Sequence, residues 1–200
     1  MQTNSLLSEI VTYVESLFRI YNKPYLLYHN LYHTRQVVRH AEEIASHYEL
    51  ENNSFFEVVA AAWFHDTGQL TGEPGGHEER GVQIMKEFLA GKNSDEKIIT
   101  GISLCIMATK MTATASTLTE QIICDADTYH LGTKDFLRLD KLVWEEMEQR
   151  LNKPISNKIQ RSLVFLEKHQ FFTLYCRQLL SAGKDRNISQ LKMFLHEDKQ

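Results

Sequence analysis

Apolar residues recur along most of the chain at the three- and four-residue spacing of amphipathic helices. Residues 5–20 show this pattern, with a stripe made of Leu6, Leu7, Ile10, Val11, Val14, Leu17 and Phe18. Residues 31–50 repeat it, and residues 55–66 are apolar almost all round, which predicts a central helix. No stretch shows the sustained alternation of a strand. The sequence therefore predicts an all-α fold.

Glycine, proline and polar segments divide the rest of the chain. Residues 67–76 (TGQLTGEPGG) are rich in glycine and predict a loop, and the Thr- and Ser-rich segment 109–119 predicts a second one. The remaining apolar stripes predict further helices at about 77–90, 95–108, 119–131, 133–151, 156–169, 170–182 and 186–196. Gly183 predicts a break between the last two helices.

The length of 200 residues fits one domain, by the usual range of about 100–200 residues per domain. We expect a core at about 25–132 and a C-terminal helical extension at about 133–196, because the character of the chain changes after Gly132. In this extension, the charged faces of residues 138–150 and 158–168 are expected to be solvated sides of helices.

Composition and charge narrow the classes of function. The chain is 42% hydrophobic and 24% charged, and its net charge of -4 lacks the basic footprint of a nucleic-acid-binding protein. No apolar run approaches the ~20 residues that span a bilayer, and the N-terminal segment lacks the basic region of a signal peptide. Three isolated cysteines indicate neither a disulfide framework nor a thiolate zinc site. We expect a cytoplasmic protein without nucleic-acid or membrane partners, of open oligomeric state.

The apolar helix predicted at 55–66 ends in two ionisable residues, His65 and Asp66. Burying a charge is costly unless it is paired or bound to a metal. Further side chains of the ligand type lie on helices expected to pack beside this one, namely His29 and His33 in YHNLYHT (28–34), and Asp125 and Asp127 in ICDADTYHLG (123–132). Nitrogen and oxygen donors suit a divalent ion such as manganese, iron, cobalt, nickel or magnesium better than a thiolate-binding metal.

Taken in order, these motifs resemble the HD-domain superfamily of metal-dependent phosphohydrolases, with a first histidine, a His-Asp pair at a helix end and a later aspartate. Together with HEERG (77–81), they are similar to small bacterial proteins described as predicted HD phosphohydrolases. The resemblance implies an HD-like helical bundle that holds one divalent metal ion through His33, His65, Asp66 and Asp127, with Asp125 as the alternative to Asp127. Because only His77 lies between the pair and the last aspartate, a full two-metal site is not expected.

The resemblance also implies hydrolysis of a phosphoester in a nucleotide or another small phosphorylated metabolite. A divalent ion lowers the pKa of a bound water from about 15.7 to about 7, and the resulting hydroxide attacks phosphorus. Asp66 is expected to accept the proton, and Glu78 is a candidate for the same role or for holding the residues around the ion. The side chains expected to contact the substrate are His29, Asn30, Arg80, Lys110 and Lys134.

Several of these residues also have a purely structural explanation. His29 and Asn30 would equally serve to fix the loop before residue 31, and His77 is expected to begin a helix without binding metal. The histidines at positions 40, 47, 130, 169 and 196 are expected at the surface or in the tail.

Two other functions stay open from the sequence. One is a non-catalytic HD module that binds a nucleotide or a protein partner, with the helical extension as its interface. The other is a di-iron oxygenase of the same fold, which needs two metal ions and more histidines than the intervening segment supplies.

Overall fold

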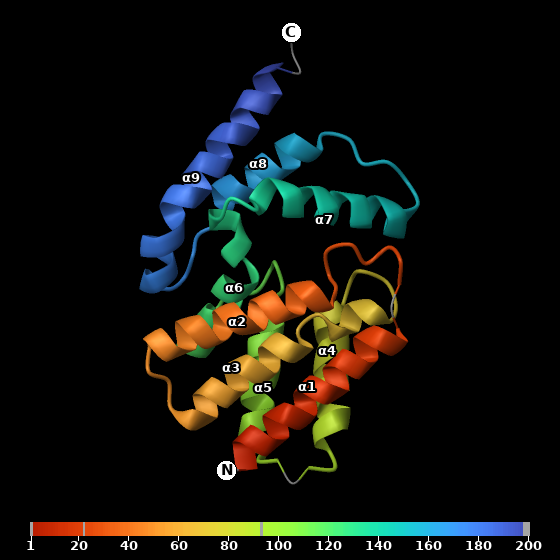
Figure 1. The fold of residues 1–200 in the computed structure, drawn as a ribbon, viewed down its shortest axis with the longest axis vertical. Coiled ribbons are helices and arrows are strands. Elements are labelled where there is room, and N and C mark those ends of the chain that lie inside the picture. The colour runs from red at the N-terminus through yellow and green to blue at the C-terminus, as the bar shows by residue number, and fades with distance from the viewer. Residues whose placement is uncertain (1, 22, 93, 198–200) are drawn as a thin grey trace.

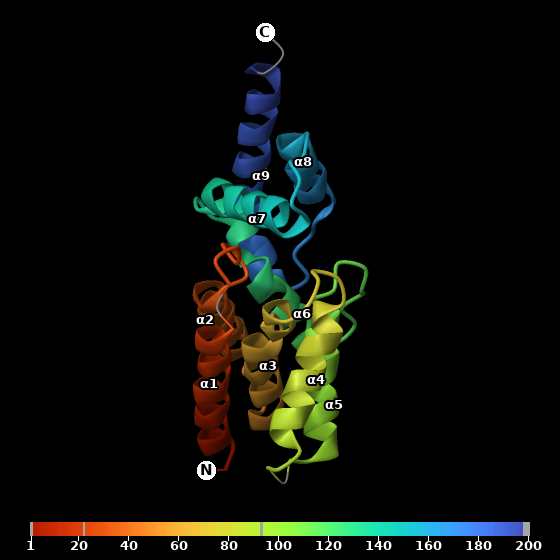
Figure 2. The same ribbon diagram turned by 90° about the vertical axis from the view of Figure 1, so that its right-hand side faces the viewer.

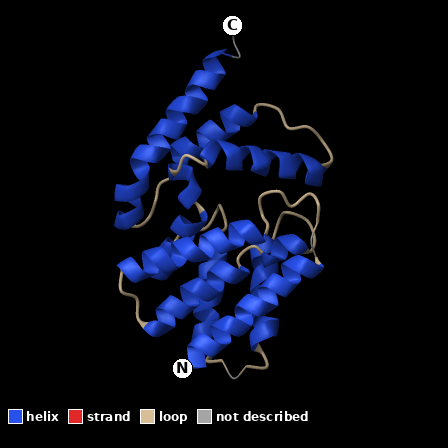
Figure 3. Ribbon diagram, in the orientation of Figure 1, coloured by secondary structure: helices blue, strands red, loops and turns tan. Residues whose placement is uncertain are grey.

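The fold consists of helices and the loops that join them (Figure 3). The computed structural model describes residues 2–21, 23–92 and 94–197, and none of these lies in a strand, so the all-α prediction is confirmed. In chain order the elements are α1 (Gln2–Ile20), α2 (Leu31–His47), α3 (Asn52–Phe64), the 3-10 helix η1 (Thr67–Leu70), α4 (His77–Leu89), α5 (Glu96–Ala108), α6 (Leu118–Asp127), the 3-10 helix η2 (Tyr129–Gly132), α7 (Phe136–Leu151), α8 (Lys158–Lys168) and α9 (Leu174–Glu197). Residues 1, 22, 93 and 198–200, which the predicted domain of residues 1–200 includes, lie outside the described residues.

Helix α3 is the centre of the lower tier of the molecule, as its nearly uniform apolar surface predicts. Figure 2 shows α3 between the α1–α2 pair and the α4–α5 pair. Every residue from Val58 to Phe64 is buried, and each large side chain among them contributes about 1.5–3 kcal/mol through its burial. Since α3 ends inside the bundle, the residues that follow it enter a buried site.

Helices α7, α8 and α9 form the upper tier (Figure 1), which is anchored to the core through Asp125. This α6 carboxylate accepts hydrogen bonds from the backbone N–H groups of Phe172 and Thr173, each at 2.8 Å. It also accepts one from the Thr173 hydroxyl at 2.6 Å. Asp125 therefore fixes the segment that leads into α9.

A second contact between the tiers corrects the predicted break at Gly183. Helix α9 runs without interruption from Leu174 to Glu197, so the prediction of two helices was wrong. A Cβ atom on Gly183 would lie 1.8 Å from the carbonyl oxygen of Gly132. The glycine is thus present because α9 crosses η2 at backbone contact, and not because the helix ends there.

Two further boundaries differ from the prediction. The helix expected at 119–131 ends at Asp127, and η2 follows after Thr128, whose hydroxyl donates to the Cys124 carbonyl at 2.7 Å. The loop predicted at 67–76 begins with η1, whose residues are all buried. Among the described residues, no helix is both long and apolar enough to cross a membrane.

Candidate metal centre

The His-Asp pair lies where α3 changes into η1. His65 caps the end of α3 and Asp66 precedes η1, so the backbone turns between them. Both side chains are almost fully buried. The His65 ring contacts the Ala62 carbonyl oxygen through Nδ1 at 2.9 Å, and because a carbonyl only accepts, this nitrogen carries a proton. His65 therefore presents Nε2 to the site.

His33 enters the same site from the first turn of α2. The side chain of Asn30 caps this helix by accepting from the N–H groups of Tyr32 and His33, and it donates to the Leu27 carbonyl. These bonds give Asn30 a structural role that matches one of the two explanations of the sequence analysis. They also fix the start of the helix from which His33 points inward.

The ligand-type atoms of three helices converge at this point. The Nε2 atom of His33 lies 3.1 Å from Asp127 Oδ1 and 3.4 Å from Asp66 Oδ2. The Nε2 atom of His65 lies 3.1 Å from Asp66 Oδ2 and 3.7 Å from Asp127 Oδ1. Single ligand atoms of His33, His65 and Asp127 all lie within 4.8 Å of one another, so these residues could hold a metal ion.

Three of the converging atoms are buried without a partner in hydrogen-bonding geometry in the described part of the chain, namely His33 Nε2, His65 Nε2 and Asp66 Oδ2. They are close together, since Asp66 Oδ2 lies 3.4 Å from His33 Nε2 and 3.1 Å from His65 Nε2, but neither contact has the geometry of a hydrogen bond. An unpaired buried polar atom costs about 1–3 kcal/mol, so three of them in one place need a compensating group. A divalent cation bound by nitrogen and oxygen atoms fits that requirement.

The charges at the site are strongly coupled. Burial alone would lower the pKa of His33, but the carboxylates of Asp127 and Asp66 raise it to about 9. Burial likewise opposes the charge of His65, and Asp66 raises its pKa. The pKa of Asp66 is held well below its usual value against burial, chiefly by the charges of His65 and His29. In the metal-free protein, protons on the imidazoles therefore balance the charge of the carboxylates. In the metal-bound protein, the cation would balance it.

The structure separates the two aspartates proposed for the last ligand position. Asp127, the final residue of α6, faces His33 and His65. Asp125 is turned toward Phe172 and Thr173 and forms the anchor described above. The geometry thus favours Asp127 over Asp125.

His77, the first residue of α4, lies on the other side of Asp66. Its Nδ1 atom donates to the Pro74 carbonyl at 2.9 Å, and its Nε2 atom lies 3.6 Å from Asp66 Oδ1. Glu78 is buried beside it, with Oε2 at 3.5 Å from His77 Nδ1. Glu78 thus lies next to an imidazole whose Nε2 atom is close to Asp66, and its role at the site stays a prediction.

The three predicted substrate cations lie in different environments. Arg80 donates to the backbone carbonyls of Gly68, Glu73 and Gly75, so its guanidinium closes the loop after η1. Lys110 forms an exposed ion pair with Glu79. Lys134 is exposed and makes no hydrogen bond or ion pair with the described residues. Contact of these side chains with a substrate stays a prediction, and Arg80 would have to break loop bonds to make it.

His29 is held at the site by a helix of the extension. Its Nδ1 atom lies 2.7 Å from Oε1 of Glu146 in α7, and its ring centroid lies 6.0 Å from that of His33 and 6.4 Å from that of His77. Oε2 of Glu146 accepts from the backbone N–H groups of Tyr28 and His29 at 2.8 and 3.0 Å. His29 thus has both a structural anchor and a ring close to the candidate ligands.

The prediction that the charged face of residues 138–150 is solvated is therefore wrong for Glu146 and Arg150. Glu146 is 1% exposed, and Arg150 lies beside it, with Nη1 at 3.3 Å from Glu146 Oε1 and 2.6 Å from Gln69 Oε1. A signal for this was present in the sequence, because Glu146 and Arg150 continue the apolar stripe of Phe136, Leu139 and Val143 at helical spacing.

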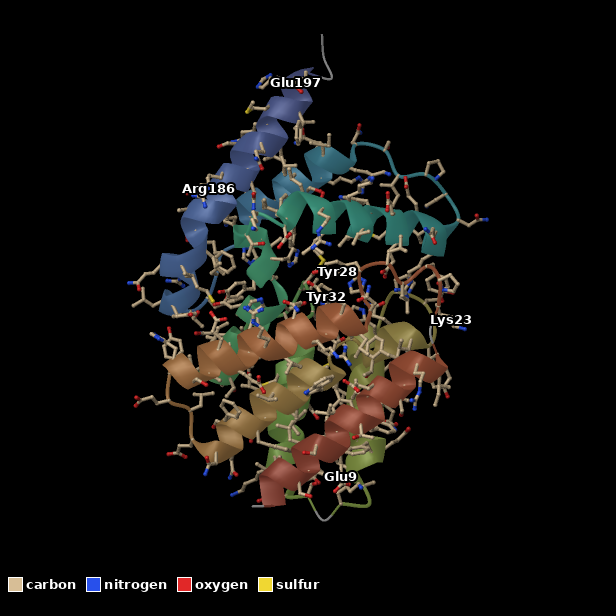
Figure 4. The ribbon with its side chains drawn as sticks, viewed as in Figure 1. Glu9, Lys23, Tyr28, Tyr32, Arg186 and Glu197 are labelled. Atoms are coloured by element: carbon tan, nitrogen blue, oxygen red, sulfur yellow. The ribbon has the colours of Figure 1, made fainter. Side chains whose placement is uncertain are left out.

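Three of the histidines expected at the surface or in the tail, His40, His130 and His169, are also partly buried. The Nδ1 atom of His130 lies 3.2 Å from the Tyr28 hydroxyl, and burial lowers the pKa of His130 to about 4. His169 contacts the Thr128 hydroxyl through Nε2 at 3.1 Å. His130 is therefore a neutral neighbour of the site, on the side where Figure 4 shows Tyr28 and Tyr32 between α2 and α7.

Comparison with known proteins agrees with this arrangement. The family model of the HD domain matches residues 30–132, just over half of the chain. Among solved structures, the chain is similar to a predicted HD superfamily hydrolase from an uncultured Thermotogales bacterium, with a TM-score of 0.61 and 22% identity over 95% of this chain and 91% of the other. At that identity the likeness concerns the fold. No curated protein matched the sequence significantly.

Proposed function

The chain belongs to the HD domain family, and we propose that it is a metal-dependent phosphohydrolase. The observation that carries this proposal is the set of buried, unpaired atoms on His33, His65 and Asp66, which converge with Asp127. Their nitrogen and oxygen donors suit manganese, iron, cobalt, nickel or magnesium. We propose a phosphoester of a nucleotide or another small phosphorylated metabolite as the substrate.

A divalent ion bound by these four side chains would supply a water molecule with a pKa of about 7 and would polarise a phosphoryl oxygen. The protein supplies the groups around that chemistry. Asp66 has two differently placed oxygens, since Oδ2 faces His33 and His65 while Oδ1 faces His77. Oδ1 is therefore the oxygen that would accept the proton of the attacking water.

Two further imidazoles face the site with one nitrogen each. The Nδ1 atom of His77 is bonded to the Pro74 carbonyl, and the Nδ1 atom of His29 is bonded to Glu146, so each ring has Nε2 available. We propose that His29 uses this nitrogen to contact a phosphoryl oxygen or the leaving group. Glu78, beside His77, would keep that ring in its orientation.

The proposal is tested by metal content and turnover measured on the same protein. Protein purified without chelator should contain about one equivalent of a transition metal by mass spectrometry, and the His65→Ala/Asp66→Ala variant should contain none. The wild type should then release phosphate from a panel of nucleotides and sugar phosphates with manganese, cobalt, nickel or magnesium added.

Other results would point to the alternative functions. Bound metal without turnover on the whole panel would leave a binding module. Iron bound in pairs, with oxygen consumption, would indicate an oxygenase. Absence of metal from both proteins, with no uptake on soaking, would contradict the metal centre itself.

A further inference from the structure

A groove leads away from the candidate metal centre between α2 and the first half of α7. Its volume is about 350 Å³, at the lower end of the range of small-molecule sites. His33 and Asp127 line the groove, so it opens directly onto two of the proposed metal ligands. A phosphoester bound at those ligands would have this space available for the group attached to its phosphate.

The walls of the groove are mixed in character. Leu27, Val37, Leu139 and Leu142 line it as apolar side chains, and Tyr32 adds a ring that is 60% exposed. Tyr32 and Gln36 are followed on α2 by Arg39 at helical spacing, and all three line the groove. The lining thus combines apolar side chains with the cations Arg39 and Arg138 and the carboxylate of Asp135.

Arg39 is an unpaired cation of this groove. It makes no ion pair or hydrogen bond with the described residues, whereas Arg138 on the opposite wall lies 3.5 Å from Asp135. Arg35, one turn earlier on α2, is paired with Glu15 at 2.7 Å. Arg39 stands six residues after His33, which corresponds to about 9 Å along the helix axis.

We propose that the groove binds the leaving group of the substrate, and that Arg39 binds a second anionic group on it. The substrate class is then a phosphoester with an apolar or aromatic body and a second phosphate or carboxylate, spaced from the first phosphate as Arg39 is spaced from the metal centre along the groove. A guanidinium recognises either anion through paired hydrogen bonds. This inference rests on the proposed function for the position of the first phosphate.

A series of alkane phosphonates measures that spacing without turnover, because their C–P bonds resist hydrolysis. Binding to the manganese-loaded protein is followed by calorimetry for alkyl monophosphonates, α,ω-bisphosphonates and ω-carboxyalkylphosphonates of increasing chain length. A doubly anionic ligand of matching length should bind about tenfold more tightly than its monophosphonate. If the second phosphonate strengthens binding more than the carboxylate does, Arg39 binds a phosphate in the substrate. If the carboxylate does so, Arg39 binds a carboxylate.

The variants Arg39→Gln and Arg35→Gln form a matched pair on one helix. Arg39→Gln should remove the advantage of the doubly anionic ligands and leave monophosphonate binding unchanged, while Arg35→Gln should keep both. If monophosphonates bind but a second anion brings no gain at any length, the groove proposal is overturned and the proposed function stands. If a second anion brings the same gain in Arg39→Gln, the role of Arg39 is refuted. If no phosphonate binds to the metal-loaded protein, both proposals fail.

Discussion

Glu146 and His29 are joined by a contact of 2.7 Å between Oε1 and Nδ1, although 117 residues separate them in the sequence. The second oxygen of the same carboxylate receives two backbone N–H groups from residues 28 and 29. Arg150 lies against Glu146 and also bonds Gln69 in η1, directly after the His-Asp pair. Helix α7 of the extension thus holds both the segment before α2 and the segment after α3.

We predict that Glu146→Gln lowers kcat by up to about a hundredfold while leaving the metal content unchanged. The amide keeps an oxygen for the backbone N–H groups but turns a donor toward His29, so the imidazole ring would rotate away. Misplacement of a catalytic group by about 1 Å can lower the rate by about a hundredfold. Steady-state kinetics on the best phosphoester of the panel, with metal analysis of the same samples, measure the effect.

The neighbouring variant Glu145→Gln is the control for this prediction, because among the described residues Glu145 has only a long ion pair with Lys141 at 3.6 Å. Its kcat should equal that of the wild type. In the His29→Ala background, Glu146→Gln should cause little further loss if it acts through His29. Fully additive losses in the double variant would show that Glu146 serves only the backbone.

The two aspartates of α6 give opposite predictions. Asp127→Asn should weaken metal binding by at least tenfold, because loss of a direct ligand should cost no less than loss of its outer partners, which is worth about 10–100-fold. Asp125→Asn should keep the metal but lose about 1–3 kcal/mol of stability, since an amide cannot accept all the hydrogen bonds from Phe172 and Thr173.

Metal titration and urea unfolding of both variants separate these effects. The prediction requires that affinity falls only in Asp127→Asn and that the larger loss of stability occurs in Asp125→Asn. A loss of metal from Asp125→Asn, with Asp127→Asn fully loaded, would exchange the assignments of the two residues.

The parts of the molecule that were predictable are those set by local pattern. The uniformly apolar sequence of residues 55–66 places α3 in the centre, and the histidine and aspartate at its end enter the core as expected. The roles of Gly183 and Arg80, by contrast, depend on contacts with other segments of the chain. Gly183 touches Gly132, and Arg80 donates hydrogen bonds to three loop carbonyls. Neither relation leaves a periodic signal in the sequence.

Glu146 is a different case, because the sequence does contain a signal for its burial. Charged residues on a helix of the extension were assigned to solvent by type, although Glu146 follows Leu139 and Val143 on the apolar stripe of α7. A buried carboxylate needs partners, and these are the backbone N–H groups of a distant segment. Because these partners are backbone groups and not side chains, the sequence alone does not reveal them.

The protonation of the site predicts that metal binding strengthens as pH rises. The pKa of His33 in the folded protein is about 9, above the ordinary value of 6.5, because Asp127 and Asp66 favour the imidazolium. That charge stabilises the metal-free protein fully below pH 6.5, and the stabilisation is lost as pH rises through about 9. A metal ion must displace this proton, so its affinity rises over the same interval.

The increase in Tm on adding manganese should therefore grow from pH 6.5 to pH 9, as scanning calorimetry with and without the ion will measure. The His65→Ala/Asp66→Ala variant should show no metal-dependent change at any pH in that interval. A metal-induced increase that shrinks as the pH rises would contradict proton displacement from His33.

We predict that a side chain at Gly68, two residues after the His-Asp pair, causes a steric clash. A Cβ atom there would lie 2.0 Å from the His77 carbonyl oxygen and 2.8 Å from its carbonyl carbon, and no side-chain rotation relieves a clash with backbone. Gly68→Ala should therefore separate η1 from the start of α4, cost about 1–3 kcal/mol and reduce metal content. Gly75→Ala is the control, because its Cβ would meet no atom of the described residues within 4 Å. Equal Tm and equal metal content in the two variants would disprove the close approach of η1 and α4.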